Sequence, residues 1–336
     1  MSTMFRLFFF CLLIPTFSTV IHHYDFEESP VEPSLYHVPV RIGHSTVNLA
    51  LDINSNRTWI FAEYGDRLLT YNSLHKQTYF QTTYTIDNDG FTAAFDGLEF
   101  EEKIGFQNQN DLVFDARKVG YVFRTTFENV GLFRDGVLGV APKSINENCL
   151  LGDVFTIITD RNETQVLIRH GRIRSSEFAI CGQITHENVS FHTQNSTEIQ
   201  RGSWNIDVLS VQFGDYEFRH KSRPYSAVFS TLSPVIVGPS TVVGQIYEAL
   251  NVTLIADKKP KVHCQTNGPE IVFQTSNGKL RVHPNQYIER KSYGCYLRLL
   301  PSKSQKSKWI LGQPFHAARC LTFDDTNQRI GIANLL

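Results

Sequence analysis

The chain has 336 residues, of which 41% are apolar and 19% are charged, and its formal net charge is −1. This composition is ordinary for a globular protein, and the length suffices for one large or two medium-sized domains. A nearly neutral chain has no electrostatic footprint for nucleic acid or for an acidic membrane surface, so neither is expected as a partner. No C-x-x-C or H-E-x-x-H spacing occurs, and neither a metal nor a cofactor is expected.

The first residues have the features of a secretory leader. Arg6 precedes a short apolar run over residues 7–14, and small residues follow at Thr16 and Ser18. The run is too short to cross a bilayer as a helix, so we predict a signal peptide over residues 1–20. No second apolar stretch approaches membrane length and no retention signal ends the chain. We therefore expect a secreted protein or, as the alternative, delivery to a lysosome-like compartment.

Sequons and cysteines are compatible with this route. We expect N-glycans at the N-x-[ST] sequons of Asn56, Asn162, Asn188, Asn195 and Asn251. Beyond the leader an odd number of cysteines remains, so at least one is unpaired or paired between chains: Cys149, Cys181, Cys264, Cys295 and Cys320.

Most of the chain predicts short strands rich in Val, Ile, Phe, Tyr and Thr and bounded by Gly, Asn, Asp or Pro. The predicted strands cover residues 36–42, 47–52, 58–61, 119–125, 178–181, 204–213, 270–273 and 329–333. Two helices are predicted, one over residues 153–160 with Asp153 as N-cap and one over residues 240–250 with Ser240 as N-cap. Strands this numerous and short indicate an all-β sandwich or barrel.

An imperfect internal repeat suggests two related lobes. In the first half a strand ending at Asp52 is followed much later by Gly136-Val-Leu-Gly-Val-Ala, and in the second half a strand ending at Phe229 is followed by Trp309-Ile-Leu-Gly-Gln-Pro. A polar stretch over residues 189–202 is the candidate connection. We predict an N-terminal lobe over residues 21–188 and a C-terminal lobe over residues 189–336.

Several spaced motifs carry a family resemblance. The C-terminal run from Trp309-Ile-Leu-Gly to Ile-Gly-Ile-Ala333, the segment Phe133-Arg-Asp-Gly-Val-Leu-Gly-Val-Ala, and the opening Asp52-Ile-Asn-Ser-Asn-Arg-Thr-Trp59-Ile resemble the pepsin family of aspartic endopeptidases. The resemblance extends over about residues 36–336. It implies an all-β, bilobal, pepsin-like fold, with two β-barrel-like lobes, a cleft between them, and a disulfide between Cys264 and Cys295.

The catalytic pattern of that family is altered in this chain. Its members hold a water between two Asp carboxylates, each in D-[TS]-G, and one carboxylate acts as base and the other as acid. Here the first motif is Asp52-Ile53-Asn54, and the second aligns as Ser230-Thr231-Leu232. Ser230 thus stands in the position of the second Asp and cannot share its proton. Asn54 replaces a glycine and suits a left-handed backbone.

Three further positions follow from the same resemblance. Phe95 aligns with the flap tyrosine and lacks its hydroxyl, while Asp96 and Leu98 replace two flap glycines. Trp59 and Thr231 are expected beside the cleft. The short segment between the predicted leader and Tyr36 leaves no room for the inhibitory prosegment that active members carry.

The leading hypothesis is a secreted, monomeric, catalytically inactive homologue whose cleft binds a peptide or protein. The main alternative is an active aspartic endopeptidase with an altered site, and a third reading is a decoy whose cleft binds nothing. Without the resemblance, Asp52 would be read as a turn cap. A nucleophilic role for Ser230 is disfavoured because no G-x-S-x-G surrounds it.

Overall fold

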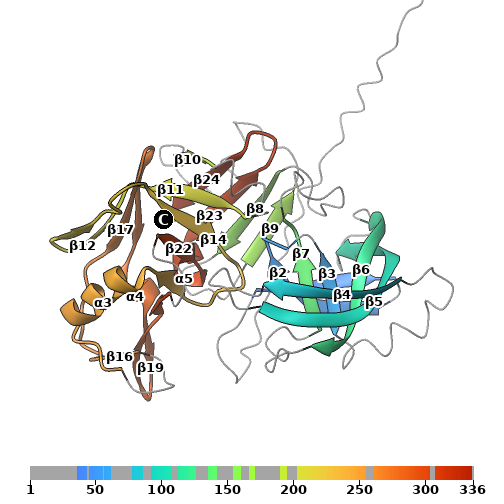
Figure 1. Ribbon diagram of the computed structural model, residues 1–336, viewed down its shortest axis with the longest axis horizontal. Helices are drawn as coiled ribbons and strands as arrows, with labels where there is room; N and C mark the ends of the chain where they lie inside the picture. Colours follow the sequence, from blue (N-terminus) through green and yellow to red (C-terminus); the bar gives the residue numbers. More distant parts are fainter. Residues whose placement is uncertain are drawn as a thin grey trace, which may run out of the picture.

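Strands dominate the computed structural model of the chain, which describes residues 36–43, 45–55, 57–61, 78–85, 92–106, 113–125, 135–141, 154–159, 166–170, 190–194, 203–254, 260–302 and 307–334. The described strands form five sheets. Figure 1 shows one large sheet on one side of the molecule, the smaller C-terminal sheets on the other, and a further sheet between them. The prediction of an all-β fold is confirmed.

The first sheet contains seven strands in the order β1-β2-β7-β3-β6-β5-β4. Strand β1 also pairs with β5, and it shows hydrophobic alternation, since Val38, Val40 and Ile42 are buried while the residues between them are partly exposed. The strands are β1 (His37–Ile42), β2 (Ser45–Asp52), β3 (Thr58–Phe61), β4 (Thr78–Thr85), β5 (Thr92–Phe106), β6 (Val113–Thr125) and β7 (Gly136–Gly139).

The second sheet joins the middle of the chain to its end. Its strands, in the order β10-β24-β23-β8-β9, are β8 (Val154–Thr159), β9 (Val166–His170), β10 (Ser190–Thr193), β23 (Arg319–Asp324) and β24 (Arg329–Asn334). The stretch predicted to connect the lobes therefore begins with strand β10, which pairs with β24. The lobe boundary itself remains a prediction.

The helix predicted over residues 153–160 is wrong, because this segment is strand β8. All six of its residues, Val-Phe-Thr-Ile-Ile-Thr, are β-branched or aromatic and favour a strand. The deciding partner is distant in sequence, since Ile158 pairs with Cys320 of β23. The possible N-cap at Asp153 does not outweigh the pairing of β8 with β23.

Three smaller sheets complete the C-terminal half. The first has the order β11-β14-β22-β15-β21, the second β13-β12-β17-β18 and the third β16-β20-β19. Their strands are β11 (Asn205–Val208), β12 (Ser210–Phe213), β13 (Tyr216–Phe218), β14 (Tyr225–Phe229), β15 (Ile236–Gly238), β16 (Lys261–Val262), β17 (Ile271–Thr275), β18 (Gly278–Val282), β19 (Ile288–Lys291), β20 (Gly294–Leu297), β21 (Leu299–Pro301) and β22 (Lys308–Leu311).

Three helices occur among the described residues: α3 (Ser240–Ala249), α4 (Pro284–Tyr287) and α5 (Gln313–His316). Helix α3 confirms the predicted helix and buries Val242, Val243, Ile246 and Tyr247 on one face. Its N-cap is Pro239 rather than Ser240, and no side chain caps it. The other strand predictions match the structure, with residues 204–213 divided between β11 and β12, except that residues 178–181 lie outside the described residues.

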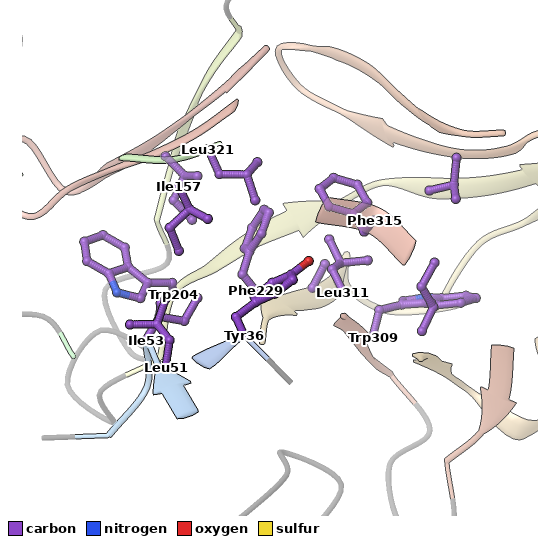
Figure 2. Close-up of a cluster of buried hydrophobic side chains, with 14 of the residues drawn as sticks. Tyr36, Leu51, Ile53, Ile157, Trp204, Phe229, Trp309, Leu311, Phe315 and Leu321 are labelled. Carbon is purple, nitrogen blue, oxygen red and sulfur yellow. The ribbon is translucent and has the colours of Figure 1, made fainter. Parts of the chain in front are cut away.

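One hydrophobic core runs through both halves of the chain. Leu51 and Ile53 of the first half belong to the same buried cluster as Trp204 and Phe229 of the second half. Figure 2 shows these side chains, with Tyr36, next to one another. The core therefore lies directly beneath the two loops that follow β2 and β14.

Candidate functional site

Asp52 is the last residue of β2, at the point where this strand leaves the seven-stranded sheet. Strand β2 runs parallel to β7, and Asp52 pairs with Gly139. Only 5% of Asp52 is exposed, and its Oδ1 accepts a hydrogen bond of 2.9 Å from the N–H of Asn54. The carboxylate is thus held at a strand end by its own turn.

Ser230 directly follows β14 and occupies the corresponding place in the second half. Strand β14 runs parallel to β22, so that Phe229 pairs with Leu311, and the N–H of Ser230 donates to the Leu311 carbonyl at 3.1 Å. Ser230 is 3% exposed. In the first half β3 pairs antiparallel with β7, and in the second half β15 pairs antiparallel with β22. The predicted repeat is therefore one arrangement of strands used twice.

The two loops also match in their local hydrogen bonds. Ser55 Oγ donates to the Arg57 carbonyl at 2.9 Å, and Ser233 Oγ donates to the Val235 carbonyl at 2.7 Å. Ser55 lies three positions after Asp52, and Ser233 lies three positions after Ser230. Ser230 is therefore the structural counterpart of Asp52.

A glycine allows each loop to fold tightly: Gly139 ends strand β7, and Gly312 directly follows strand β22. A Cβ on Gly139 would lie 2.3 Å from the Arg57 carbonyl oxygen, and a Cβ on Gly312 would lie 2.2 Å from the Val235 carbonyl oxygen. Because no side chain is tolerated at either position, the glycines of the G-V-L-G-V-A and W-I-L-G motifs serve the loops rather than their own strands.

The two loops are joined by reciprocal hydrogen bonds. Thr231 Oγ1 donates to the carbonyl of Leu51, which precedes Asp52, at 2.5 Å. Asn54 Nδ2 donates to the carbonyl of Phe229, which precedes Ser230, at 2.7 Å. Each loop thus contributes one side-chain donor to the backbone of the other.

Asn54 has a different role from the one predicted for it. The non-glycine residues with positive φ in the described part of the chain are Asn251, Ala318 and Gln328, so Asn54 does not adopt a left-handed backbone. Its Oδ1 accepts from the Trp204 N–H at 3.1 Å, while its Nδ2 bonds to Phe229. The amide therefore supplies the donor that Ile53, lacking a hydroxyl, cannot provide. The signal for this role in the sequence was the amide side chain of Asn54, which directly follows Ile53, the residue that lacks the hydroxyl.

The geometry is matched by the sequence comparisons. The profile of the family described as eukaryotic aspartyl protease matches residues 35–335. This chain belongs to that family. Its fold is accordingly the bilobal, all-β, pepsin-like fold.

Similar proteins include embryonic pepsinogen of Gallus gallus, which is 24% identical over 61% of this chain and 51% of its own length. Chymosin of Bos taurus is 22% identical over 60% of this chain and 54% of its own length. Pepsin II-1 of Oryctolagus cuniculus is 23% identical over 84% of this chain and 76% of its own length. The chain thus spans about half the length of the first two of these relatives.

Phe95 and Trp59 of this aspartyl protease homologue lie in a second hydrophobic cluster. Phe95 is fully buried on β5, and its ring contacts that of Trp59 edge to face at 5.4 Å between centroids. The ring of Phe61 also contacts that of Phe95 edge to face, at 5.7 Å between centroids. The structure thus gives Phe95 a position inside the sheet, and the flap role stays a prediction.

A buried histidine lies beneath the Ser230 loop. The ring of His316 stacks on that of Phe229 at 6.5 Å and on that of Tyr36 at 6.1 Å. Burial, and then the nearby cation of Arg319, lower the pKa of His316 to about 3, and the Leu311 backbone acts in the opposite direction. His316 is therefore neutral here, and the sequence reasoning did not identify it.

The predicted disulfide between Cys264 and Cys295 is present, with 5.2 Å between the Cα atoms. Cys320 is also disulfide-bonded, to a cysteine outside the described residues. Cys149 and Cys181 both lie outside the described residues. Of the predicted glycan sites, Asn251 is described and exposed, whereas Asn56, Asn162, Asn188 and Asn195 are not described.

The described residues contain neither a cluster of metal ligands nor a membrane-spanning helix. No group of three or more His, Cys, Asp or Glu side chains is placed to hold a metal ion there. Nor does any helix among them have the length and apolarity needed to cross a membrane.

Proposed function

We propose that this protein is a catalytically inactive aspartyl protease homologue that binds a peptide or protein in the cleft between its lobes. The observation that carries the proposal is that Ser230 is the counterpart of Asp52 in the repeated strand arrangement. A serine hydroxyl does not titrate near working pH, so it cannot share a proton with Asp52 as a second carboxylate would. Loss of one general acid or base typically lowers the rate by about 10²–10⁴-fold.

The apolar residues around Asp52 support the same proposal. Ile53 is fully buried in the main core, where a hydroxyl is expected in active members. Leu232, in place of a glycine, is 6% exposed and packs in the second cluster. Such side chains stabilise the loops and add nothing to the activation of a water molecule.

The hydrogen bonds between the loops favour a retained binding surface. Asn54 and Thr231 hold the two loops together although Ile53 has lost its hydroxyl. A partly buried amide with both of its ends bonded fixes one loop geometry, and a fixed loop geometry lowers the entropic cost of binding a ligand.

The second candidate function is aspartic endopeptidase activity, the activity of the family. It is favoured by Asp52, whose carboxylate is retained and held by the Asn54 N–H. In that case Asp52 would act with a partner other than Ser230.

We further propose that the protein is secreted. The apolar run over residues 7–14 and the disulfide between Cys264 and Cys295 favour an oxidising route. The neutral, buried His316 favours a compartment near neutral pH over an acidic, lysosome-like one, because its protonation would destabilise the fold.

Activity is tested with a casein substrate from acidic to neutral pH, with and without pepstatin. We expect no pepstatin-sensitive cleavage, and any residual cleavage should be equal in the Asp52→Asn protein, which keeps the shape of the side chain. Pepstatin-sensitive cleavage that is lost in Asp52→Asn would establish the endopeptidase instead.

Binding is tested separately by selecting a displayed library of random peptides on the purified protein. Selected peptides should slow backbone hydrogen exchange in the Asp52 and Ser230 loops and leave helix α3 unchanged as the internal control. If no peptide is enriched, or if protection falls outside both loops, the binding part of the proposal is wrong.

A further inference from the structure

Leu232 crosses from the C-terminal half of the chain into the N-terminal half. It lies two residues after Ser230, in the position where the family pattern has a glycine. It belongs to a hydrophobic cluster whose other buried members are Ala50, Trp59, Phe61, Phe95, Val122 and Val137. All of these others come from the seven-stranded sheet, so Leu232 is the one C-terminal residue among the described members of the cluster.

This cluster lies on the face of the sheet that carries the Asp52 side chain. Successive residues of a strand point to opposite faces, so Ala50 and Asp52 of β2 share one face. Leu51 points to the other face, where it joins the main core. Ala50 pairs with Val137 of β7, and Val137 is also a member of the cluster. The cluster that holds Leu232 therefore adjoins Asp52 along β2.

Burial is consistent with a cover over this face. Asp52 is 5% exposed and Ser230 is 3% exposed. The position of Leu232 is fixed by the residue before it. Thr231 Oγ1 donates a hydrogen bond to the Leu51 carbonyl and accepts one from the Ile53 N–H at 3.3 Å. The backbone that carries Leu232 is thus fixed to the strand that carries Asp52.

We propose that Leu232 is an internal blocking residue, which occupies the apolar site beside Asp52 and keeps ligands and reagents from the carboxylate. The side chain supplies from within the chain the apolar contact that a ligand side chain would otherwise make with Trp59 and Phe95. A peptide held between the lobes then lies over the two loops, outside Leu232, and does not reach the Asp52 carboxylate.

This inference deepens the proposed function, on which its statement about a bound peptide rests. Its core, the protection of Asp52 by Leu232, is independent of both turnover and peptide binding. The experiment therefore measures access to the Asp52 carboxylate directly, so that a negative result here leaves the activity and binding tests unaffected.

The experiment is carboxyl labelling with a water-soluble carbodiimide and glycinamide near pH 6, followed by peptide mapping of Asp52 by mass spectrometry. The variant is Leu232→Ala. The matched control is Leu280→Ala, because Leu280 is likewise 6% exposed but belongs to the main core. A third protein, Leu232→Met, restores the apolar volume at the same position.

We expect Asp52 to be labelled about tenfold faster in Leu232→Ala than in the wild type, because a buried group reacts only through local opening. Leu280→Ala and Leu232→Met should label Asp52 at the wild-type rate. The proposal is overturned if Asp52 is labelled readily in the wild type, if Leu232→Ala leaves the rate unchanged, or if Leu280→Ala raises it equally. Should Leu232→Ala not fold, the same outcomes are read from Leu232→Val, which removes less volume.

Discussion

Replacing His316 by leucine should make the fold markedly less sensitive to acid. The imidazole is fully buried and stacks on the rings of Tyr36 and Phe229. The guanidinium of Arg319 is also buried, and its Cζ lies 4.1 Å from the centroid of the Phe315 ring. In the unfolded chain a histidine titrates near 6.5, whereas the pKa of His316 in the folded protein is lowered to about 3. Leucine has a similar volume and no charge to gain.

The magnitude follows from proton linkage. Between pH 6.5 and about 3 the unfolded state binds one more proton at this position than the folded state, so the free energy of unfolding decreases as pH falls. Each pH unit corresponds to about 1.4 kcal/mol, so that about 3 kcal/mol is lost between pH 6.5 and pH 4.5. This is a large fraction of a typical total stability of about 5–15 kcal/mol. Above pH 6.5 the contribution of this group to the pH dependence vanishes.

The assay is equilibrium unfolding in urea, followed by tryptophan fluorescence, at pH values from about 7 to about 4.5. The carboxylates lose stability in the same direction in both proteins, so the difference between wild type and His316→Leu isolates the histidine. We expect this difference to change by about 3 kcal/mol over the range. Parallel curves for the two proteins would show that His316 is hydrated or charged in the folded state, and the reasoning would fail.

Three other outcomes are expected. Asn54→Ala should lower the free energy of unfolding in urea by about 1–3 kcal/mol, because it leaves the Phe229 carbonyl and the Trp204 N–H without their side-chain partner. Asn54→Asp keeps the acceptor for Trp204 and loses the donor to Phe229, so comparing the two variants separates the two bonds. Cys295→Ser should cost about 2–5 kcal/mol, and a reducing agent should then have little further effect on this loop, whereas equal reductant sensitivity in both proteins would contradict the role of the Cys264 bond. After expression through a secretory pathway, Thr253→Ala should lose the mass of one glycan, since Asn251 and Thr253 are exposed, and an unchanged mass would show that the sequon is not used.

The outline of the site could be predicted from sequence because the motifs are local. The Asp52 and Ser230 loops each contain a short strand end, a turn residue and a serine, and the family resemblance of the residues around Ser230 sets its alignment with the second Asp. Strand β3 (Thr58–Phe61) was predicted with its observed bounds, since four buried residues between turn signals leave little choice.

What could not be predicted depends on residues distant in the chain. The composition of β8 favours a strand, but no local pattern reveals its partner β23, whose pairing decides against the helix. Asn54 was interpreted through its backbone preference, yet its function lies in a hydrogen bond to Phe229 in the other half. The burial of Leu232 among N-terminal residues likewise requires both halves to be in place.

The sheet that joins the middle of the chain to its end has a consequence for biosynthesis. Strand β8 is synthesised well before its partner β23, and Thr159 cannot pair with Arg319 until that residue has been made. Until then one edge of β8 lacks that partner and is a template for wrong pairing. Pairing over so long a separation in sequence is slow, so this edge of β8 stays open to wrong pairing until β23 has been made and has docked.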